Sequence, residues 1–80
     1  MKILLTGALG YIGTQFVYNM RNTKHTIVGF DNSQDAIDNR LAGALQYNNN
    51  FSFKKKDLLD DLSEYKDVDM IVHLAAEVGY

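Results

Sequence analysis

The 80-residue chain combines 46% hydrophobic with 22% charged positions, which is typical of a soluble globular protein long enough for one domain. Eight basic and ten acidic residues give a net charge of -2, a balance that provides no electrostatic footprint for nucleic acid or an anionic membrane. Without cysteine, and without an apolar run near the roughly 20 residues of a membrane span, disulfides and thiolate chemistry are excluded and we expect a cytoplasmic protein.

The first half of the chain predicts two strands and two helices. Residues 2–6, KILLT, form a continuous apolar run ended by glycine, as expected of a strand covered on both faces. Apolar residues follow helical spacing from Gly10, and residues 25–31, HTIVGFD, predict a second buried strand. Ser33 can cap the second helix. The expected apolar faces are Ile12, Phe16, Val17 and Met20 on the first helix and Ile37, Leu41, Ala44 and Leu45 on the second.

The second half predicts two further strands with a short helix between them. FSF at 51–53 leads into a third strand near Lys54, and leucines at helical spacing indicate a helix over 58–65. DMIVHLAA at 69–76 predicts the fourth strand. The basic cluster 54–56 is followed directly by aspartates, so we interpret it as a solvated strand end and not as a phosphate or RNA patch.

Strands that alternate with helices at these spacings indicate βαβ units and a parallel sheet with right-handed crossovers. We therefore expect residues 1–80 to have an α/β fold with about four parallel strands and three helices. We expect them to form part of a Rossmann-type doubly wound parallel sheet, in which these strands have the order 3-2-1-4. This order leaves the fourth strand with an unpaired apolar edge. We expect these residues alone to be marginally stable or to self-associate for that reason.

Half of the six glycines, Gly7, Gly10 and Gly13, lie between the first strand and the first helix. At such a turn the first glycine permits a tight bend, and the second lets the backbone approach phosphates that face the N–H groups of the helix. The third lets the helix lie close to the sheet. The first gap is one residue longer than in the G-x-G-x-x-G of many dehydrogenases. The stretch predicts a pyrophosphate site, although glycines also cluster in ordinary strand-to-helix turns.

The end of the second strand supports a dinucleotide ligand. Asp31 follows Gly13 by 18 residues, close to the spacing of about 20 expected for a carboxylate that accepts hydrogen bonds from the adenosine ribose. A carboxylate there repels a 2′-phosphate, and no arginine follows before Arg40, so NAD is favoured over NADP. The alternative is a turn residue in the sequence DNS. The chain has no G-x-x-x-x-G-K-[ST], which disfavours a P-loop nucleotidase.

TGALGYIG at 6–13 resembles the T-G-x-x-G-[FY]-[IL]-G opening of the extended short-chain dehydrogenase/reductases, whose best-known members are NAD-dependent nucleotide-sugar epimerases and dehydratases. FDNS, KKDLLD and VHLAA resemble the family's segments at the ends of the next three strands, in the family's order. The resemblance implies Asp31 as the ribose ligand with Asn32 beside it, and Asp57 and Leu58 at the adenine. The implied cofactor-binding residues are Gly7, Gly10, Tyr11, Ile12, Gly13, Asp31, Asn32, Asp57, Leu58, Leu74, Ala75 and Ala76.

The resemblance also implies that catalysis depends on a Tyr-x-x-x-Lys pair with a serine or threonine. None of the five tyrosines of this chain is followed by lysine at that spacing, so we expect no catalytic residue here and no activity of this chain alone. We also expect no metal site, since the chain has no cysteine to form a thiolate site. His73, a lone histidine in an apolar strand, is interpreted as a satisfied core residue. We expect the N-terminal part of a longer, homodimeric NAD-dependent enzyme that acts on a nucleotide-sugar by transient hydride transfer.

Two other functions fit the same residues. The first is a non-catalytic dinucleotide-binding module that senses NAD or holds partner proteins. The second is a Rossmann-like domain for FAD or S-adenosylmethionine. A Tyr-x-x-x-Lys pair further along the reading frame favours the enzyme, and its absence there favours a module. The particular sugar nucleotide and the reaction branch do not follow from these residues.

Overall fold

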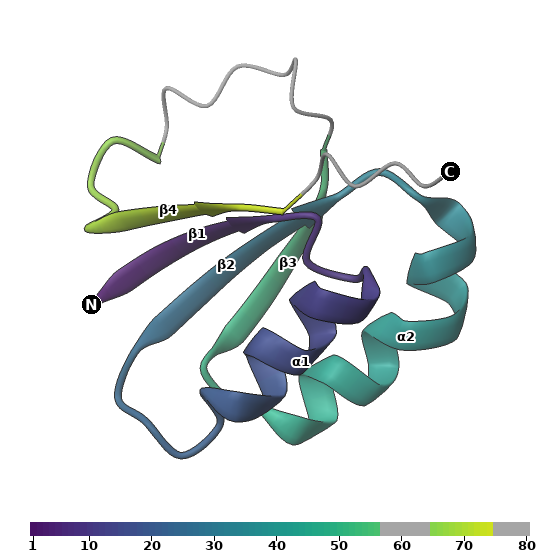
Figure 1. Cartoon of the computed structure of the whole chain (residues 1–80), viewed down its shortest axis with the longest axis horizontal. Coiled ribbons are helices and arrows are strands. Elements are labelled where there is room, and N and C mark those ends of the chain that lie inside the picture. The colour runs from purple at the N-terminus through teal and green to yellow at the C-terminus, as the bar shows by residue number, and fades with distance from the viewer. Residues whose placement is uncertain (57–64, 75–80) are drawn as a thin grey trace.

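The computed structural model describes residues 1–56 and 65–74, which form a four-stranded parallel sheet and two α-helices (Figure 1). The sheet has the order β3-β2-β1-β4, which confirms the expected order 3-2-1-4. The elements in chain order are β1 (Lys2–Thr6), α1 (Tyr11–Asn19), β2 (Thr26–Asp31), α2 (Gln34–Tyr47), β3 (Phe51–Lys55) and β4 (Met70–His73).

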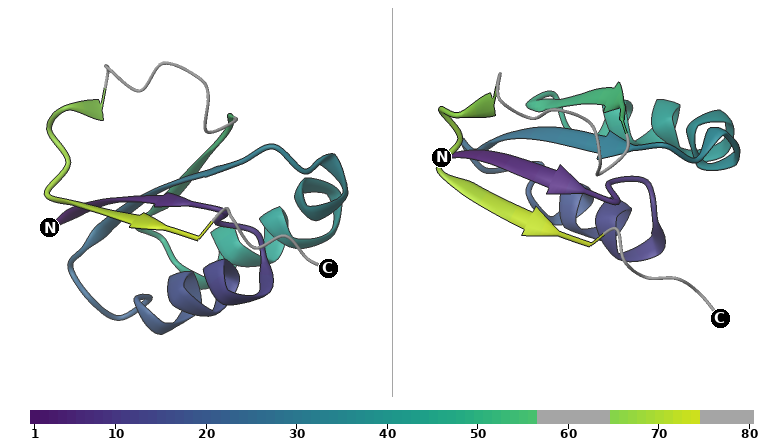
Figure 2. Two further views of the ribbon diagram at one scale, coloured as in Figure 1. Left: turned by 45° about the horizontal axis from the view of Figure 1, so that its top comes forward. Right: turned by 90° about the horizontal axis from the view of Figure 1, so that it is seen from above.

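The two helices lie on the same face of the sheet, as the turned views show (Figure 2). They follow β1 and β2, whose crossovers step in one direction along the sheet to β3. The chain then returns to pair β4 with the other side of β1, so that Leu4 is aligned with both Val28 and Ile71. On the opposite face, Tyr65 and Val68 pack against a buried cluster that contains Leu4 and Val28. The strand order therefore reverses between β1 and β4.

Two expectations about the elements need correction. The described residues contain two helices, not three, and the third expected helix falls mostly on residues 57–64, which lie outside the described residues. The fourth strand was expected over 69–76, whereas β4 spans Met70–His73 and residues 75–76 are outside the described residues. The remaining strands and helices lie where the hydrophobic patterns predict them.

The core is built by alternate residues of the central strands. Ile3 and Leu5 face the helices and Leu4 faces the other side, and each is almost fully buried. Burial of one such side chain contributes about 1.5 to 3 kcal/mol. Gly29 on β2 leaves room for this packing, because a Cβ there would lie 2.6 Å from a ring carbon of Phe51. The continuous apolar runs thus form strands that are covered on both faces.

The apolar helix faces differ from expectation at two positions. Ile12 is 69% exposed and Leu45 is 42% exposed, whereas Val17 and Ala44 are buried between helix and sheet. Asn48 is also buried: its Nδ2 donates to the Val17 carbonyl oxygen at 3.0 Å, and its Oδ1 accepts from the Asn50 N–H. A residue expected to be turn material therefore joins the end of α2 to α1.

β4 is the outermost strand at its side of the described sheet, next to β1. Its residues Met70 and Ile71 are 43% and 59% exposed. In the described part of the chain, this strand edge is apolar and unpaired, which is the arrangement that favours pairing with another strand. Neither helix among the described residues is long and apolar enough to cross a membrane.

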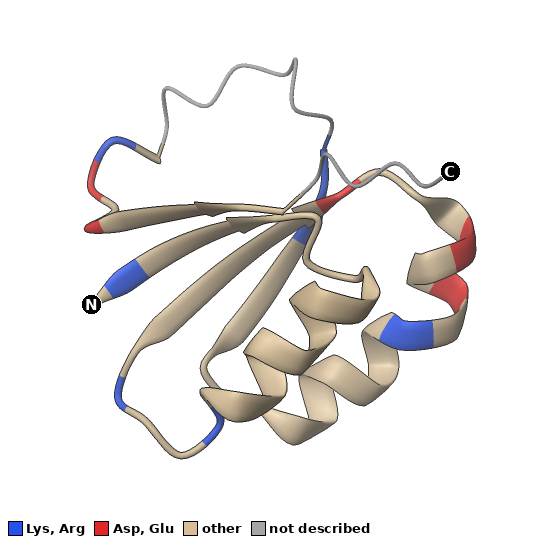
Figure 3. Ribbon diagram, in the orientation of Figure 1, with Lys and Arg blue, Asp and Glu red and all other residues tan. Residues whose placement is uncertain are grey.

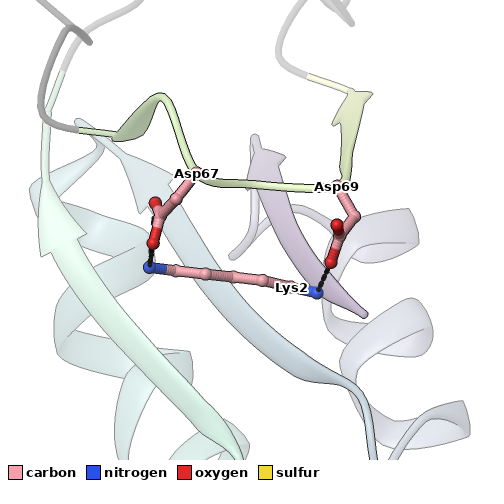
Figure 4. A network of polar contacts seen from close by, with 3 residues as sticks. All are labelled: Lys2, Asp67 and Asp69. Atoms are coloured by element: carbon pink, nitrogen blue, oxygen red, sulfur yellow. Dashed lines mark hydrogen bonds and ion pairs between the residues drawn. The ribbon is translucent and has the colours of Figure 1, made fainter.

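A small polar network ties the start of β1 to the segment before β4 (Figure 4). The Lys2 ammonium group donates to both carboxylate oxygens of Asp67, at 3.0 and 3.2 Å, and the Lys2 backbone N–H donates to Asp69 at 2.7 Å. The hydrogen bond from Lys2 holds the pKa of Asp67 below its ordinary value of 3.8. The Asp67 pKa is lower in the folded than in the unfolded chain. The Lys2–Asp67 pair therefore stabilises the fold above the unfolded pKa of Asp67, and this stabilisation is lost as the pH falls through the folded pKa.

Replacing Lys2 with methionine removes the ammonium group and should raise the pKa of Asp67 towards 3.8. An NMR titration of the Asp67 side chain measures this change. Lys2→Arg is the matched control, because it keeps a cation within reach of the carboxylate. An unchanged pKa in Lys2→Met would show that Lys2 is not the cause of the lowered value.

Candidate functional site

A pocket of about 750 Å³ lies at the carboxyl edge of the sheet, a volume within the range of ligand sites. It is placed where the strand order reverses between β1 and β4, the position at which open α/β sheets bind ligands. Residues from the ends of β1, β2 and β4 and from the starts of α1 and α2 line it. They are Gly7, Leu9, Gly10, Tyr11, Ile12, Gly13, Asp31, Ser33, Asp35, Ala36, Arg40, His73 and Leu74.

The turn from β1 into α1 depends on two of its glycines. Gly7 has φ of 68°, a conformation that glycine adopts without steric cost. Gly13 is buried in α1, and a Cβ there would lie 2.3 Å from the Gly7 carbonyl oxygen and 2.7 Å from backbone atoms of Ala8. Because those neighbours are backbone, they cannot move aside as a side chain can. Gly13 therefore lets the helix pack directly on the turn, whereas the sequence predicts that this glycine lets the helix lie close to the sheet.

Gly10, unlike Gly13, is not required by the packing of the fold. Its φ of -74° suits any residue, and a Cβ there would meet only the Gly7 carbonyl oxygen at 3.5 Å, an ordinary van der Waals contact. The fold itself therefore accepts a side chain at position 10. Since Gly10 lines the pocket at the start of α1, the space in front of it is free for a ligand to approach the backbone.

The N-terminus of α1 favours an anion. No side chain caps Gly10, and the first turn contains no acidic residue, so the positive end of the helix and its N–H groups are not neutralised locally. Figure 3 shows no charged residue anywhere on α1. By contrast, α2 is capped by Ser33, whose hydroxyl accepts from the Ala36 N–H, and carries Asp35 in its first turn. Of the two described helices, α1 thus offers the pocket an uncapped N-terminus and α2 does not.

Asp31, at the end of β2, joins the two loops that border the pocket. One carboxylate oxygen accepts from the Leu9 N–H at 3.0 Å and the other from the Ser33 N–H at 3.1 Å. A carboxylate has about four lone-pair sites, so two backbone bonds leave acceptor capacity for hydroxyl donors. Asp31 therefore holds the glycine turn, which the sequence analysis did not foresee, and can still accept hydrogen bonds from a ribose.

Arg40 is a pocket residue that the sequence analysis missed. Its Nη1 donates to the Leu9 carbonyl oxygen at 2.8 Å, and its guanidinium carbon lies 4.3 Å from the centroid of the Tyr11 ring. With no arginine between Asp31 and Arg40, the sequence favours NAD over NADP and indicates no role for Arg40 at the site. Ala36 and Arg40 are four residues apart, and this spacing indicates that Arg40 lies on the same face of α2 as Ala36. The bond from Arg40 to Leu9, however, forms only because α2 packs beside the glycine turn.

His73 does not have the environment expected for it. It is exposed and lines the pocket, although its Nδ1 lies 3.0 Å from the Thr6 hydroxyl oxygen and is hydrogen-bonded there. The same hydroxyl accepts from the Leu74 N–H at 3.2 Å. The prediction of a core residue is wrong because β4 is the outermost strand at this side of the described sheet.

The structure brings most of the predicted cofactor residues together. Seven of them line this pocket: Gly7, Gly10, Tyr11, Ile12, Gly13, Asp31 and Leu74. Asn32 is exposed beside the pocket and is not a lining residue. Asp57, Leu58, Ala75 and Ala76 lie outside the described residues. Among residues 1–56 and 65–74, no group of three or more potential metal-ligating side chains is found.

A parallel sheet of order 3-2-1-4 with a glycine turn into its first helix defines a Rossmann-like α/β fold. The profile of the NAD dependent epimerase/dehydratase family matches residues 3–80. The chain therefore belongs to this NAD-dependent family, which confirms the resemblance seen in the sequence.

Relatives of both kinds, epimerase and dehydratase, are similar to the chain. The dTDP-glucose 4,6-dehydratase of Salmonella typhimurium is 32% identical over 96% of the chain and 23% of its own length. Among solved structures, the UDP-Glc/GlcNAc 4-epimerase of Campylobacter jejuni has a TM-score of 0.71 and 34% identity over 98% of this chain and 25% of that one. The dTDP-glucose 4,6-dehydratase of Bacillus anthracis, solved in complex with NAD, has a TM-score of 0.71 and 32% identity over 96% and 27%. The chain thus spans about a quarter of the length of these relatives.

Proposed function

We propose that the pocket binds the ADP-ribose half of NAD, with the pyrophosphate at the N-terminus of α1. The observation that carries the proposal is the uncapped start of α1 in a pocket where Gly10 leaves its backbone open to a ligand. Helix N-termini of this kind bind phosphate groups through unsatisfied N–H groups and the helix dipole. The similar dehydratase solved in complex with NAD supports NAD as the ligand.

The remaining pocket residues fit the other parts of the cofactor. Asp31 accepts hydrogen bonds from the adenosine ribose hydroxyls, and its negative charge disfavours the 2′-phosphate of NADP. Tyr11 and Ile12 contribute the N–H groups of the first turn of α1, and Leu74 borders the cofactor from the end of β4. Asn32 lies beside the ribose in this proposal. Asp57 and Leu58 at the adenine, and Ala75 and Ala76 near the ribose and pyrophosphate, complete the predicted site.

We further propose that the chain is the dinucleotide-binding portion of an enzyme that oxidises a nucleotide-sugar transiently, in a homodimer. When bound, NAD supplies a hydride acceptor, and this chain's residues bind and orient it. The support is membership of a family in which both epimerases and dehydratases occur. These 80 residues contain no Tyr-x-x-x-Lys, so the proton-transfer group is not among them. That observation keeps a non-catalytic NAD-binding module as the second candidate.

Gly10→Ala tests the binding site directly. The free fold accommodates the new methyl group, so we expect the free energy of unfolding to change by less than about 1 kcal/mol. The methyl group occupies the space that the pyrophosphate needs, so we expect the affinity for NAD to fall by at least about tenfold. Calorimetric titration of NAD and NADP into the wild-type chain and the variant measures the affinities, and urea denaturation measures the stability.

Gly43→Ala is the control, since a Cβ at that glycine of α2 meets nothing closer than 4.0 Å and lies outside the pocket. It should leave NAD binding unchanged. The proposal is wrong if the wild-type chain binds no NAD, or if Gly10→Ala binds it as tightly as the wild type. Tighter binding of NADP than of NAD would contradict the role given to Asp31.

A further inference from the structure

The peptide groups of Leu9 are held from both sides by charged side chains. The carboxylate of Asp31 accepts from the Leu9 N–H, and the guanidinium of Arg40 donates to the Leu9 carbonyl oxygen at 2.8 Å. These partners are 22 and 31 residues away in the sequence. The Leu9 side chain is completely buried, and Leu9 is one of the residues that line the pocket. The middle of the glycine turn is therefore fixed by β2 on one side and α2 on the other.

The bond from Arg40 sets the orientation of the peptide unit that leads into α1. The Leu9 carbonyl and the Gly10 N–H belong to one planar trans unit and point in opposite directions. With the carbonyl held by Arg40, the Gly10 N–H points to the Gly7 carbonyl oxygen at 3.1 Å. A rotation of this unit would break both bonds. Arg40 thus stabilises the conformation from which the first turn of α1 starts.

The same bond improves the electrostatics of the pocket for an anion. A carbonyl oxygen is the negative end of a peptide dipole, and one at the turn would oppose a pyrophosphate. The guanidinium on the Leu9 carbonyl offsets that negative end with a full positive charge. Within the described ranges, the salt bridge joins Lys2 and Asp67, so no carboxylate contacts the Arg40 guanidinium directly there. Its charge adds to the positive N-terminus of α1.

Arg40 also contacts the first side chain of α1, that of Tyr11. Its guanidinium carbon lies 4.3 Å from the centroid of the Tyr11 ring, and Tyr11 is 82% exposed with this contact in place. Cation–π contacts of this kind contribute about 0.5 to 1 kcal/mol at exposed sites. Because Arg40 lies between the ring and the Leu9 carbonyl, one side chain of α2 holds both the turn and the residue that follows it.

We propose that Arg40 is a positioning residue for the pyrophosphate: it holds the Leu9 carbonyl and the Tyr11 ring so that the N–H groups of α1 face the ligand. This rests on the proposed binding of a dinucleotide at the pocket. It assigns to Arg40 the ordering of the turn and not a bond to a 2′-phosphate. If Arg40 bound the 2′-phosphate directly, its replacement would lower the affinity for NADP alone. If Arg40 positions the turn, its replacement lowers the affinity for NAD and ADP as well.

The test compares Arg40→Met with Arg21→Met. Arg21 makes the same two kinds of contact, donating to the Tyr18 carbonyl oxygen at 2.9 Å and stacking 3.8 Å over the Tyr18 ring, but it does not line the pocket. Arg40→Met should lower the affinity for NAD and for ADP by about tenfold, which is the effect of losing one hydrogen bond to a charged group. Adenosine, which lacks phosphates, should bind as before in an NMR titration. Arg21→Met should change none of these affinities.

Amide hydrogen exchange without any ligand gives an independent measurement. In Arg40→Met the Gly10 amide should exchange several-fold faster than in the wild type, whereas Arg21→Met should leave it unchanged. Arg40→Lys keeps the charge without the planar fork and should lie between wild type and Arg40→Met in both measurements. This second measurement separates the two proposals: if the wild-type chain binds no dinucleotide, the proposed function fails, and unchanged Gly10 exchange in Arg40→Met overturns the hold on the turn.

Three other outcomes would overturn the role of Arg40. The first is NAD affinity in Arg40→Met equal to that of the wild type. The second is an equal loss for adenosine and ADP, which would place the effect outside the phosphates. The third is a loss confined to NADP, which would make Arg40 a ligand of the 2′-phosphate.

Discussion

Gly13→Ala should abolish NAD binding and lower the free energy of unfolding by about 3 kcal/mol. The added Cβ would lie 2.3 Å from the Gly7 carbonyl oxygen and 2.7 Å from the Ala8 backbone, so α1 must move away from the turn or the turn must open. A loss of this size is a large fraction of the total stability of a small domain. Urea denaturation followed by circular dichroism measures the loss, and calorimetric titration measures NAD binding.

Gly10→Ala is the matched control for this variant, because it adds the same methyl group three residues earlier in the same turn. Both variants should lose affinity for NAD, but only Gly13→Ala should lose substantial stability. If the two unfold at the same urea concentration as the wild type, the close contact between α1 and the turn does not determine stability. The pair therefore separates the glycine required by the fold from the glycine required by the ligand.

Asp31→Ala should weaken NAD binding by about ten- to a hundredfold, since it removes hydrogen bonds from ribose hydroxyls to a charged group. It also leaves the N–H groups of Leu9 and Ser33 without their acceptor, which should cost about 1 to 2 kcal/mol of stability. Asp31→Asn keeps one acceptor oxygen and removes the charge. We expect its preference for NAD over NADP to shrink, as measured by the ratio of the two dissociation constants.

Asp35→Ala is the control for the charge of the pocket. Asp35 lines the same pocket from the first turn of α2, but it has no hydrogen bond to the glycine turn among those described. Its replacement should leave NAD affinity within about twofold of the wild type, because the hydrogen bond it loses is to Asn39 within α2 and no contact with the glycine turn is lost. Equal losses in Asp31→Ala and Asp35→Ala would show that the pocket responds to net charge and that Asp31 has no particular place in it.

Much of the fold could be predicted because its signals are local. The apolar run 2–6 and its glycine end predict a buried strand, and Ser33 predicts the start of α2, where its hydroxyl indeed accepts from the Ala36 N–H. The parallel sheet followed from the alternation of elements and the handedness of crossovers, whereas the order 3-2-1-4 was expected as that of a Rossmann-type sheet. Ile12 departs from its helical face because it lies in the first turn of α1, at the pocket and beyond the cover of the sheet.

The candidate site was predictable only in part, for a physical reason. The glycines and Asp31 are recognisable as site residues because each lies at a strand end or turn that the local sequence pattern predicts. Arg40 and His73 are pocket residues through contacts 31 and 67 residues away, to Leu9 and Thr6, and no local pattern encodes such distances. Their positions depend on how α2 packs and on which strand is outermost.

The amino-acid sequence by itself determined the parallel α/β class, the glycine turn, the carboxylate after the second strand and the family. Those properties rest on hydrophobic periodicity and on residue types that one turn or one strand end requires. The sequence already assigned Gly10 to the ligand and Gly13 to helix packing, and the tertiary structure decided that Gly13 packs against the backbone of Gly7 and Ala8. It also decided that Arg40 clamps the turn, because steric fit and hydrogen bonding between distant segments exist only once the helices pack on the sheet.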